Sequence, residues 1–178
     1  DAVSRIIAHR AANGDAVCSP NTASYCTARS RIPEDVLRTL AMQTAKELQA
    51  SISDEWKWNG RSVFIVDGSH VSMPDTPENQ EVYPQPTNQK PGLGFPLARI
   101  TVALSLATGA CHDLEIASYA GKGTGEKSLF GRMYDTFRPG DVVLTDSNFD
   151  DYFIACDLCQ RGIDIVARVR HARAGSWI

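Results

Sequence analysis

Two short apolar runs, each followed directly by an aspartate, stand out in the pattern of hydrophobic and polar positions. Residues 63–66 precede Asp67 and Gly68, and residues 142–145 precede Asp146. Four mostly apolar, β-branched residues in a row predict a strand that is buried on both faces. Gly68 predicts a sharp turn, which would leave Asp67 at the end of the first strand, facing a cleft.

A carboxylate beside a buried strand is costly unless it has a partner or binds a metal ion. A single aspartate in this position usually begins a turn or caps a helix. Two of them in one chain favour a shared carboxylate site formed by Asp67 and Asp146. The turn or cap interpretation stays open for each aspartate.

Residues 1–58 have the spacing of a helical region. Apolar positions predict a first helix, which the turn residues 13–15 end. Ser19-Pro20 predicts the start of a second helix, and Pro33, followed by two acids, predicts the start of a longer one. The apolar stripe of this longer helix consists of Val36, Leu37, Leu40, Ala41, Ala45 and Leu48.

The turn signal Asn59-Gly60 predicts a boundary between this helical region and a second domain, residues 59–178. Within that domain, residues 72–96 contain six of the nine prolines and predict a long loop, which is usually functional or disordered. Asp75 and Glu78 in this loop are candidate ligands, although turn-forming acids are the better interpretation.

After the loop, residues 97–106 and 110–118 predict two strands joined by a tight turn. A helix is expected next, with Leu129, Phe130, Met133, Tyr134 and Phe137 on its inner side. Asp150 predicts the cap of another helix that runs to about Gln160, and residues 163–169 predict a last strand. The order of elements predicts an α/β fold with a mixed sheet flanked by helices.

Two segments resemble functional motifs, a phosphate-binding loop and a C-x-x-C site, but structural roles explain them better. The glycine-rich segment 121–128 lacks the glycine that a Walker loop needs before Lys-Ser, because Glu126 stands there. Glu126 is therefore expected in the first turn of a helix, with catalysis as the weaker alternative. Cys156 and Cys159 have C-x-x-C spacing but no second Cys or His pair, which favours a place in the core over a zinc or redox site.

The distribution of charge along the chain is more informative about function than the net charge. The net charge is −3, but residues 61–160 contain an excess of acids, and the end of the chain contains an excess of bases. An acidic middle suits a carboxylate metal site, and basic side chains suit phosphate contacts. The candidates for DNA contact are Arg29, Arg31, Lys90, Arg168 and Arg170, and solvated surface positions are the alternative for Arg29 and Arg31.

Several longer motifs sharpen this interpretation. The sequence around Asp67 is W-x-W-N-G-R-x-V-x-x-V-D-G-S, and the sequence around Asp146 is G-D-V-V-L-T-D-S-N-F-D-D-Y-F. Between them stand M-P-D-T-P-E-N-Q, Y-P-Q-P-x-x-Q-K-P-G-x-G-F-P and G-K-G-T-G-E-x-S-L, and upstream stands S-P-N-T-x-S-Y-C-x-A-R-x-R-I-P. These segments, roughly residues 19–173, resemble the IS-four family of bacterial insertion-sequence transposases, which are DDE transposases with a ribonuclease H-like fold.

The resemblance implies that Asp67 and Asp146 are the first two acids of the DDE triad and bind Mg²⁺, for which Mn²⁺ can substitute. The family's third acid, a glutamate, would lie beyond Ile178, so the chain is expected to be an N-terminal and central piece with little activity alone. Ser147 stands where the family often has arginine. The implied function is metal-dependent cleavage and strand transfer at transposon ends.

The implied partners are double-stranded DNA, both transposon ends and target, and a second copy of the protein when bound to DNA. No signal peptide is present, and no apolar run approaches the ~18 residues of a membrane span. We therefore expect no membrane association and a bacterial cytoplasmic, nucleoid-associated protein. Two alternatives stay open: an inactive DNA-binding remnant of a decayed element, and a ribonuclease H-like metal-dependent nuclease.

Overall fold

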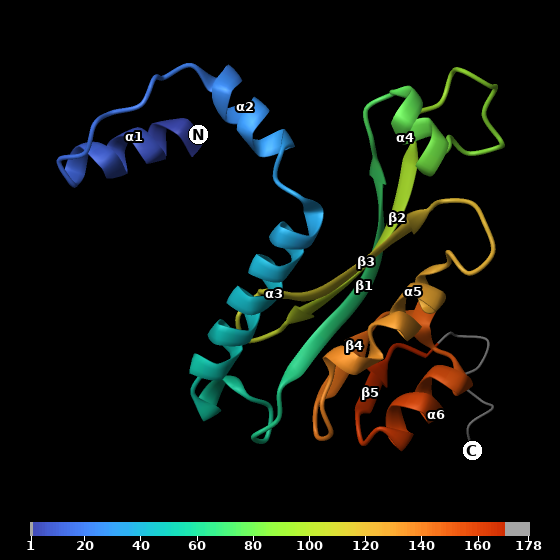
Figure 1. The fold of residues 1–178 in the computed structure, drawn as a ribbon. Helices are drawn as coiled ribbons and strands as arrows, with labels where there is room; N and C mark the ends of the chain where they lie inside the picture. Colours follow the sequence, from blue (N-terminus) through green and yellow to red (C-terminus); the bar gives the residue numbers. More distant parts are fainter. Residues whose placement is uncertain (1, 170–178) are drawn as a thin grey trace. The chain divides into compact units, whose positions relative to one another are not determined.

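The computed structural model describes residues 2–169 and consists of two compact units, residues 1–40 and the rest of the chain from Ala41. The division falls inside a helix, whereas the sequence predicts a boundary at residue 58. That predicted boundary stays a prediction. Because the two units are separate bodies, each is described by itself (Figure 1).

The first unit contains the helices α1 (Ala2–Ala12) and α2 (Thr22–Ser30) and the beginning of α3 (Glu34–Ser51). Asn13 and Gly14 follow α1, as expected, and Gly14 adopts a left-handed conformation with φ of +74°. The predicted start of the second helix at Ser19-Pro20 is wrong by a few residues. Asn21 is the true cap, because its side chain accepts a hydrogen bond from the Ala23 amide.

The second unit is built on one five-stranded sheet in the order β3-β2-β1-β4-β5 (Figure 1). Its strands are β1 (Val63–Ser72), β2 (Leu97–Ser105), β3 (Cys111–Ser118), β4 (Val142–Thr145) and β5 (Asp164–Ala167). β2 is antiparallel to both of its neighbours, while β1, β4 and β5 run parallel. This strand order and these strand directions confirm the α/β fold with the mixed sheet that is expected of a ribonuclease H-like domain.

The first strand differs from its prediction in two respects. β1 does not end at Asp67, because Asp67 and Gly68 pair with Val102 and Thr101 of β2 and the strand continues to Ser72. The expected sharp turn at Gly68 is therefore wrong. β1 is also not buried on both faces: Phe64 and Val66 are buried, and the alternate positions are only partly covered. Pairing with β4, however, ends at Val66.

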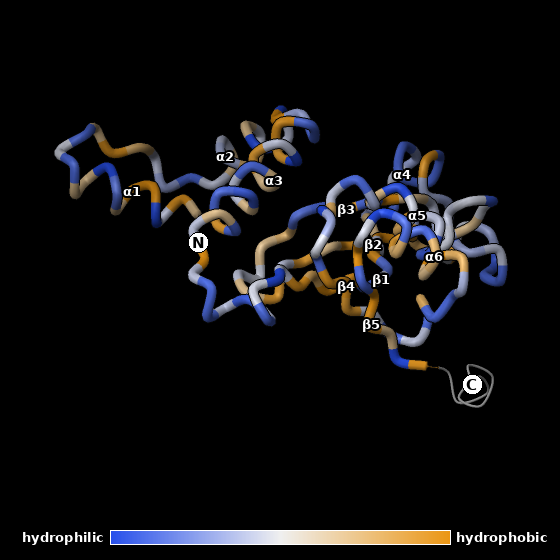
Figure 2. Tube along the Cα trace, turned by 90° about the horizontal axis from the view of Figure 1, so that it is seen from below, coloured by the Kyte–Doolittle hydropathy of each residue, from blue (hydrophilic) through white to orange (hydrophobic). Residues whose placement is uncertain are grey.

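The core lies on one face of this sheet, under two helices. α5 (Glu126–Arg132), the 3-10 helix η2 (Tyr134–Thr136) and α6 (Tyr152–Gln160) cover the face that carries Phe64, Val66, Ala103 and Val143. The other buried members of this core cluster, from the covering elements and the connections beside them, are Phe130, Met133, Tyr134, Phe137, Phe149, Ile154, Leu158 and Ile163. Figure 2 shows the hydrophobic strands among more hydrophilic connections.

Three further elements differ from their predictions. The helix expected through Phe137 stops at Arg132 and continues as η2, although all five residues of its predicted inner side are buried. The cap of α6 is Asp151, not Asp150, because the Asp151 side chain accepts a hydrogen bond from the Phe153 amide. The last strand is shorter than predicted and ends at Ala167.

The predicted loop 72–96 contains a short helix, α4 (Pro77–Val82). Thr76 caps it by accepting a hydrogen bond from the Asn79 amide, and Pro77 occupies the first turn, where its missing N–H costs nothing. The segment is thus ordered rather than an open loop. The amide side chains of Gln80 and Gln85 hold its remainder together.

Candidate carboxylate site

Asp67 and Asp146 occupy equivalent places on neighbouring parallel strands. Val66 of β1 pairs in register with Thr145 of β4, and each aspartate is the next residue in its chain direction. Adjacent strands lie ~4.8 Å apart, so the two backbones are close at this edge of the sheet. This is the carboxyl end of the parallel strands, where open α/β sheets bind their ligands.

Both carboxylates are exposed, and each is held by one local hydrogen bond. Asp67 Oδ1 accepts a hydrogen bond from the Gly68 amide at 2.8 Å, and Asp146 Oδ1 accepts one from the Asn148 amide at 2.8 Å. Within residues 2–169, no salt bridge involves either aspartate, and Oδ2 of each has no hydrogen-bond partner. Two negatively charged groups therefore stand at one edge with oxygens available to a ligand.

A third carboxylate, that of Glu126, approaches from the start of α5. A Cβ atom built onto Gly68 would lie 2.8 Å from Oε1 of Glu126, which is closer than real side chains tolerate, so the glutamate side chain lies directly against Gly68. Its other oxygen, Oε2, accepts a hydrogen bond from the side-chain amide of Asn148. Glu126 thus contacts the residue after Asp67 and a residue of the turn that follows Asp146.

Glu126 lies in the first turn of a helix, as the sequence predicts, but its contacts with Gly68 and Asn148 were not predicted. The available signal was Gly68. Its backbone lies outside the left-handed region, so it is needed for the close approach of Glu126 rather than for a turn. The neighbouring Lys127 is directed to a different acid, since its ammonium group pairs with Asp151 at 2.8 Å.

The donor atoms at this edge suit a hard divalent cation by type, because Mg²⁺ prefers carboxylate and water oxygens. Mg²⁺ is commonly held by only one or two protein carboxylates together with substrate phosphates, a role that Asp67 and Asp146 can fill. Across residues 2–169, no group of three or more His, Cys, Asp or Glu side chains is arranged to hold a metal ion. The two aspartates would therefore supply only part of a coordination shell.

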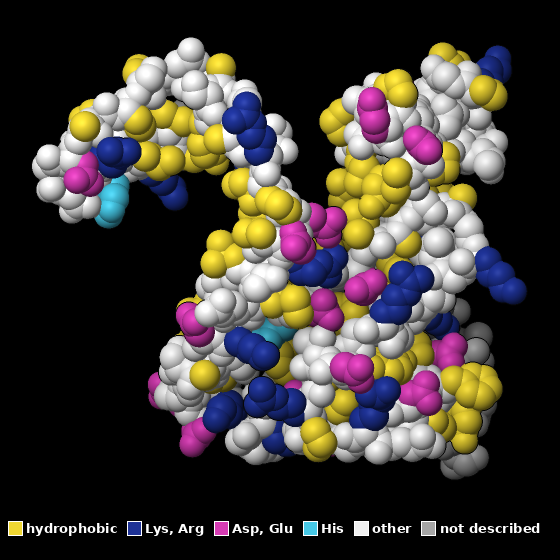
Figure 3. All heavy atoms as spheres, viewed as in Figure 1, with side chains coloured by type: hydrophobic (Ala, Val, Ile, Leu, Met, Phe, Trp, Pro, Cys, Tyr) yellow, Lys and Arg dark blue, Asp and Glu magenta, His cyan; other side chains and the backbone are white. Residues whose placement is uncertain are grey.

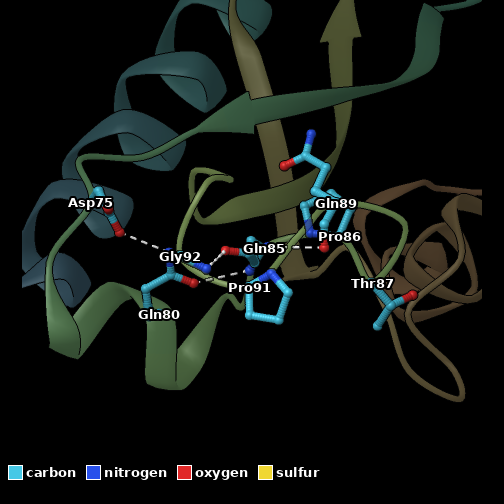
Figure 4. Close-up of a pocket in the computed structure, with 8 residues that line it drawn as sticks. All are labelled: Asp75, Gln80, Gln85, Pro86, Thr87, Gln89, Pro91 and Gly92. Atoms are coloured by element: carbon cyan, nitrogen blue, oxygen red, sulfur yellow. Dashed lines mark hydrogen bonds between the residues drawn. The ribbon is translucent and has the colours of Figure 1, made fainter.

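The two candidate ligands in the segment 72–96, Asp75 and Glu78, both have structural partners. Asp75 accepts a hydrogen bond from Gln80 at 2.7 Å, and this contact borders a pocket of about 570 Å³ (Figure 4). The pocket is lined by Asp75, Gln80, Gln85, Pro86, Thr87, Gln89, Pro91 and Gly92. Glu78 lies in the first turn of α4, where hydrogen bonds from its own backbone amide and from Thr76 lower its pKa.

The cysteines of α6 differ from their predicted place in the core. Cys159 is exposed and Cys156 is partly exposed, while Ile154 and Leu158 supply the buried side of the helix. Both thiols are free.

The DNA-contact candidates are distributed over both units. Arg29 lies in the last turn of α2, Arg31 follows that helix, and Lys90 belongs to the exposed end of the segment 72–96. Arg168 follows β5, whose last residue, Ala167, pairs with Thr145, so it stands at the carboxyl edge of the sheet. Arg170 lies outside the described residues. On the face of the second unit seen in Figure 3, acidic and basic side chains are interspersed.

No family model matches the chain. A curated protein does: over 122 residues, 68% of this chain, the sequence is 23% identical to "Transposase InsG for insertion sequence element IS4" of Escherichia coli strain K12. The chain is similar to an IS4 transposase. The similarity agrees with the resemblance to the IS-four family derived from the motifs. The chain covers 27% of the length of this relative.

A solved structure with a similar arrangement is that of the piggyBac transposase, determined as a synaptic complex with hairpin DNA. The TM-score is 0.42 at 13% identity, and the match covers 63% of this chain and 24% of that one. Among the described residues, no helix is both long enough and apolar enough to cross a membrane.

Proposed function

We propose that this chain is part of a DNA transposase of an insertion sequence, and that Asp67 and Asp146 form part of its metal-dependent DNA cleavage site. One observation carries the proposal: the two aspartates follow residues paired in register on the adjacent parallel strands β1 and β4. The sequence similarity to the IS4 transposase supports the same function. Double-stranded DNA would be the substrate and a second copy of the protein the partner in the complex with DNA.

The residues at this edge would each have a distinct task. Asp67 and Asp146 would hold Mg²⁺, or Mn²⁺ in its place, through the carboxylate oxygens that make no hydrogen bond within residues 2–169. Bound divalent cations lower the pKa of a nucleophilic water or hydroxyl and stabilise charge on the leaving oxygen of a phosphodiester. The hydrogen bonds from the amides of Gly68 and Asn148 fix the orientation of the two carboxylates.

The test is DNA cleavage by the complete protein with Asp67→Asn or Asp146→Asn. Asparagine has nearly the same shape, but its amide oxygen is a much poorer ligand for Mg²⁺. Cleavage of labelled DNA ends taken from the flanks of the element should fall ~10³-fold or more, equivalent to about 4 kcal/mol of transition-state stabilisation. Binding to the same DNA should persist, because phosphate contacts come from basic side chains elsewhere.

Asp75→Asn is the matched control, because this acid makes a structural hydrogen bond in the segment 72–96. It should leave cleavage near the level of the parent. Normal cleavage by Asp67→Asn would show that Asp67 is only a strand residue and would overturn the proposal. Cleavage of DNA lacking the element's ends at the same rate would instead favour a general nuclease.

A further inference from the structure

We infer that Glu126 is a positioning residue of the proposed site: it joins β1 to the turn after β4 and thereby sets the spacing of Asp67 and Asp146. The inference rests on the proposed function and adds a residue to it. Its basis is a set of contacts that link the two aspartates through one side chain on α5.

The first contact is with β1. Gly68 follows Asp67 and donates its amide hydrogen to the Asp67 carboxylate at 2.8 Å. The Glu126 side chain occupies the space above the Gly68 Cα, where any other residue would place its Cβ. Because Gly68 is paired with Thr101 in the sheet, the strand gives Glu126 a rigid surface to pack against.

The second contact is with the turn after β4. Asn148 donates its side-chain amide to Glu126 Oε2 and its backbone amide to Asp146 Oδ1. A hydrogen bond to a charged acceptor is about twice as strong as one between neutral groups. Glu126 therefore restrains Asn148, and Asn148 in turn orients the Asp146 carboxylate.

The contacts favour positioning over metal ligation. One oxygen of Glu126 is engaged by Asn148 and the other lies over the Gly68 backbone, so the carboxylate is already used within the fold. In the described part of the chain, moreover, no three acids are grouped as a metal site. Residues that orient metal ligands in this way commonly change metal affinity 10–100-fold when they are replaced.

The experiment measures Mn²⁺ binding to the 178-residue chain by titration with electron paramagnetic resonance detection. Glu126→Ala and Asn148→Ala should each weaken binding about tenfold, and the double variant should bind no more weakly than either. Gly68→Ala should have a similar effect, because its methyl group displaces the Glu126 side chain. Glu126→Gln keeps an acceptor for Asn148 and should remain within about threefold of the parent.

Glu81→Ala, the same substitution on the exposed part of α4, is the control and should leave binding unchanged. Equal losses in Glu126→Gln and Glu126→Ala would mean that the charge itself binds the metal, which overturns the positioning role. Binding that depends on Asp67 but not on Glu126, Asn148 or Gly68 would overturn it as well. Absence of Mn²⁺ binding by the parent would overturn the inference, and unaltered binding in Asp67→Asn would overturn the proposed function as well.

Discussion

The acidic residues at the two ends of the parallel strands differ in whether a cationic side chain pairs with them. At the starting end, the Arg61 guanidinium pairs with Asp164 at 2.7 Å and donates hydrogen bonds to the carbonyl oxygens of Gly140 and Asp141. At the carboxyl end, Asp67 and Asp146 are exposed, and within residues 2–169 no cation pairs with them. Compensated charge at one end is typical of a structural clamp, and uncompensated charge at the other is typical of a binding site.

The two ends of the parallel strands also differ in how far their ionisable side chains are buried. Asp141 is partly buried at the clamped end, and burial raises its pKa. Nearby, burial lowers the pKa of His112, whose ring packs edge-on against Phe64. The buried Nε2 atom of His112 has no hydrogen-bond partner among residues 2–169. The end of the sheet that contains Asp141 and His112 therefore contributes to the pH dependence of folding.

The largest effect on stability should come from Arg61→Ala. The substitution removes the ion pair to Asp164 and the side-chain hydrogen bonds to the carbonyl groups of Gly140 and Asp141, and the Asp141 carbonyl keeps the bond from the Asp164 amide. We expect the free energy of unfolding to fall by about 2 kcal/mol, because hydrogen bonds that involve a charged group contribute more than neutral ones. Denaturant unfolding measures this loss, and Mn²⁺ binding should stay at the level of the parent.

Arg61→Lys is the matched variant, because it keeps the charge but cannot bridge three acceptors with one planar group. It should recover less than half of the loss. A stability unchanged by either substitution would show that the clamp is not structural and would remove the contrast between the two ends.

The sequence predicts some features of the sheet and of the carboxylate site better than others. The strand segments before Asp67 and Asp146 follow from local apolar runs, and the placement of the two aspartates at one edge follows from their repetition. The continuation of β1 to Ser72 does not, because residues 67–72, apart from Val71, are polar or glycine and are held in the strand by pairing with β2. That pairing depends on residues some 30 positions away.

Local sequence patterns likewise could not predict the contacts of Glu126. Its helix is predictable, but its contact with Gly68 exists only when α5 packs on the sheet. The cap of α6 shows a smaller limit: Asp150 and Asp151 are adjacent aspartates, and local preference cannot choose between them. The ion pair of Asp151 with Lys127 favours the second.

His112→Phe should produce a smaller effect that depends on pH. Burial lowers the pKa of His112 in the folded state, so on acidification the unfolded chain binds a proton first, below about pH 6.5. Stability is then lost as the pH falls, by up to about 1.4 kcal/mol per pH unit until the folded state also protonates. Phenylalanine preserves the edge-on contact with Phe64 and cannot titrate.

The measurement is the free energy of unfolding of parent and variant between pH 7.5 and pH 5, taken as a difference so that other titrating groups largely cancel. The free energy of unfolding of the variant should rise relative to that of the parent as the pH falls. The raised pKa of Asp141 acts in the opposite direction, since the folded state there binds its proton first. A constant difference across the range would show that His112 is not buried in its neutral form.

Asp67→Asn should have the smallest effect on the free energy of unfolding. The direction of this change distinguishes the carboxyl end of the parallel strands from their starting end. Asparagine can still accept the hydrogen bond from the Gly68 amide, so the local geometry should persist. Without divalent cations, loss of one of two neighbouring negative charges relieves repulsion that solvent largely screens. The free energy of unfolding should therefore stay within about 0.5 kcal/mol of the parent, on the higher side.

Asp151→Asn is the matched change at an acid that has a cation. Asparagine also serves as a helix cap, so the hydrogen bond from the Phe153 amide is retained and only the ion pair with Lys127 is lost. Stability should fall, by about 0.5 kcal/mol. Thermal melts in chelator measure both variants, and addition of Mn²⁺ should stabilise the parent and Asp151→Asn more than Asp67→Asn. If Asp67→Asn melts far below the parent instead, the carboxylate is structural, and the exposed end of the sheet is a second clamp rather than a site.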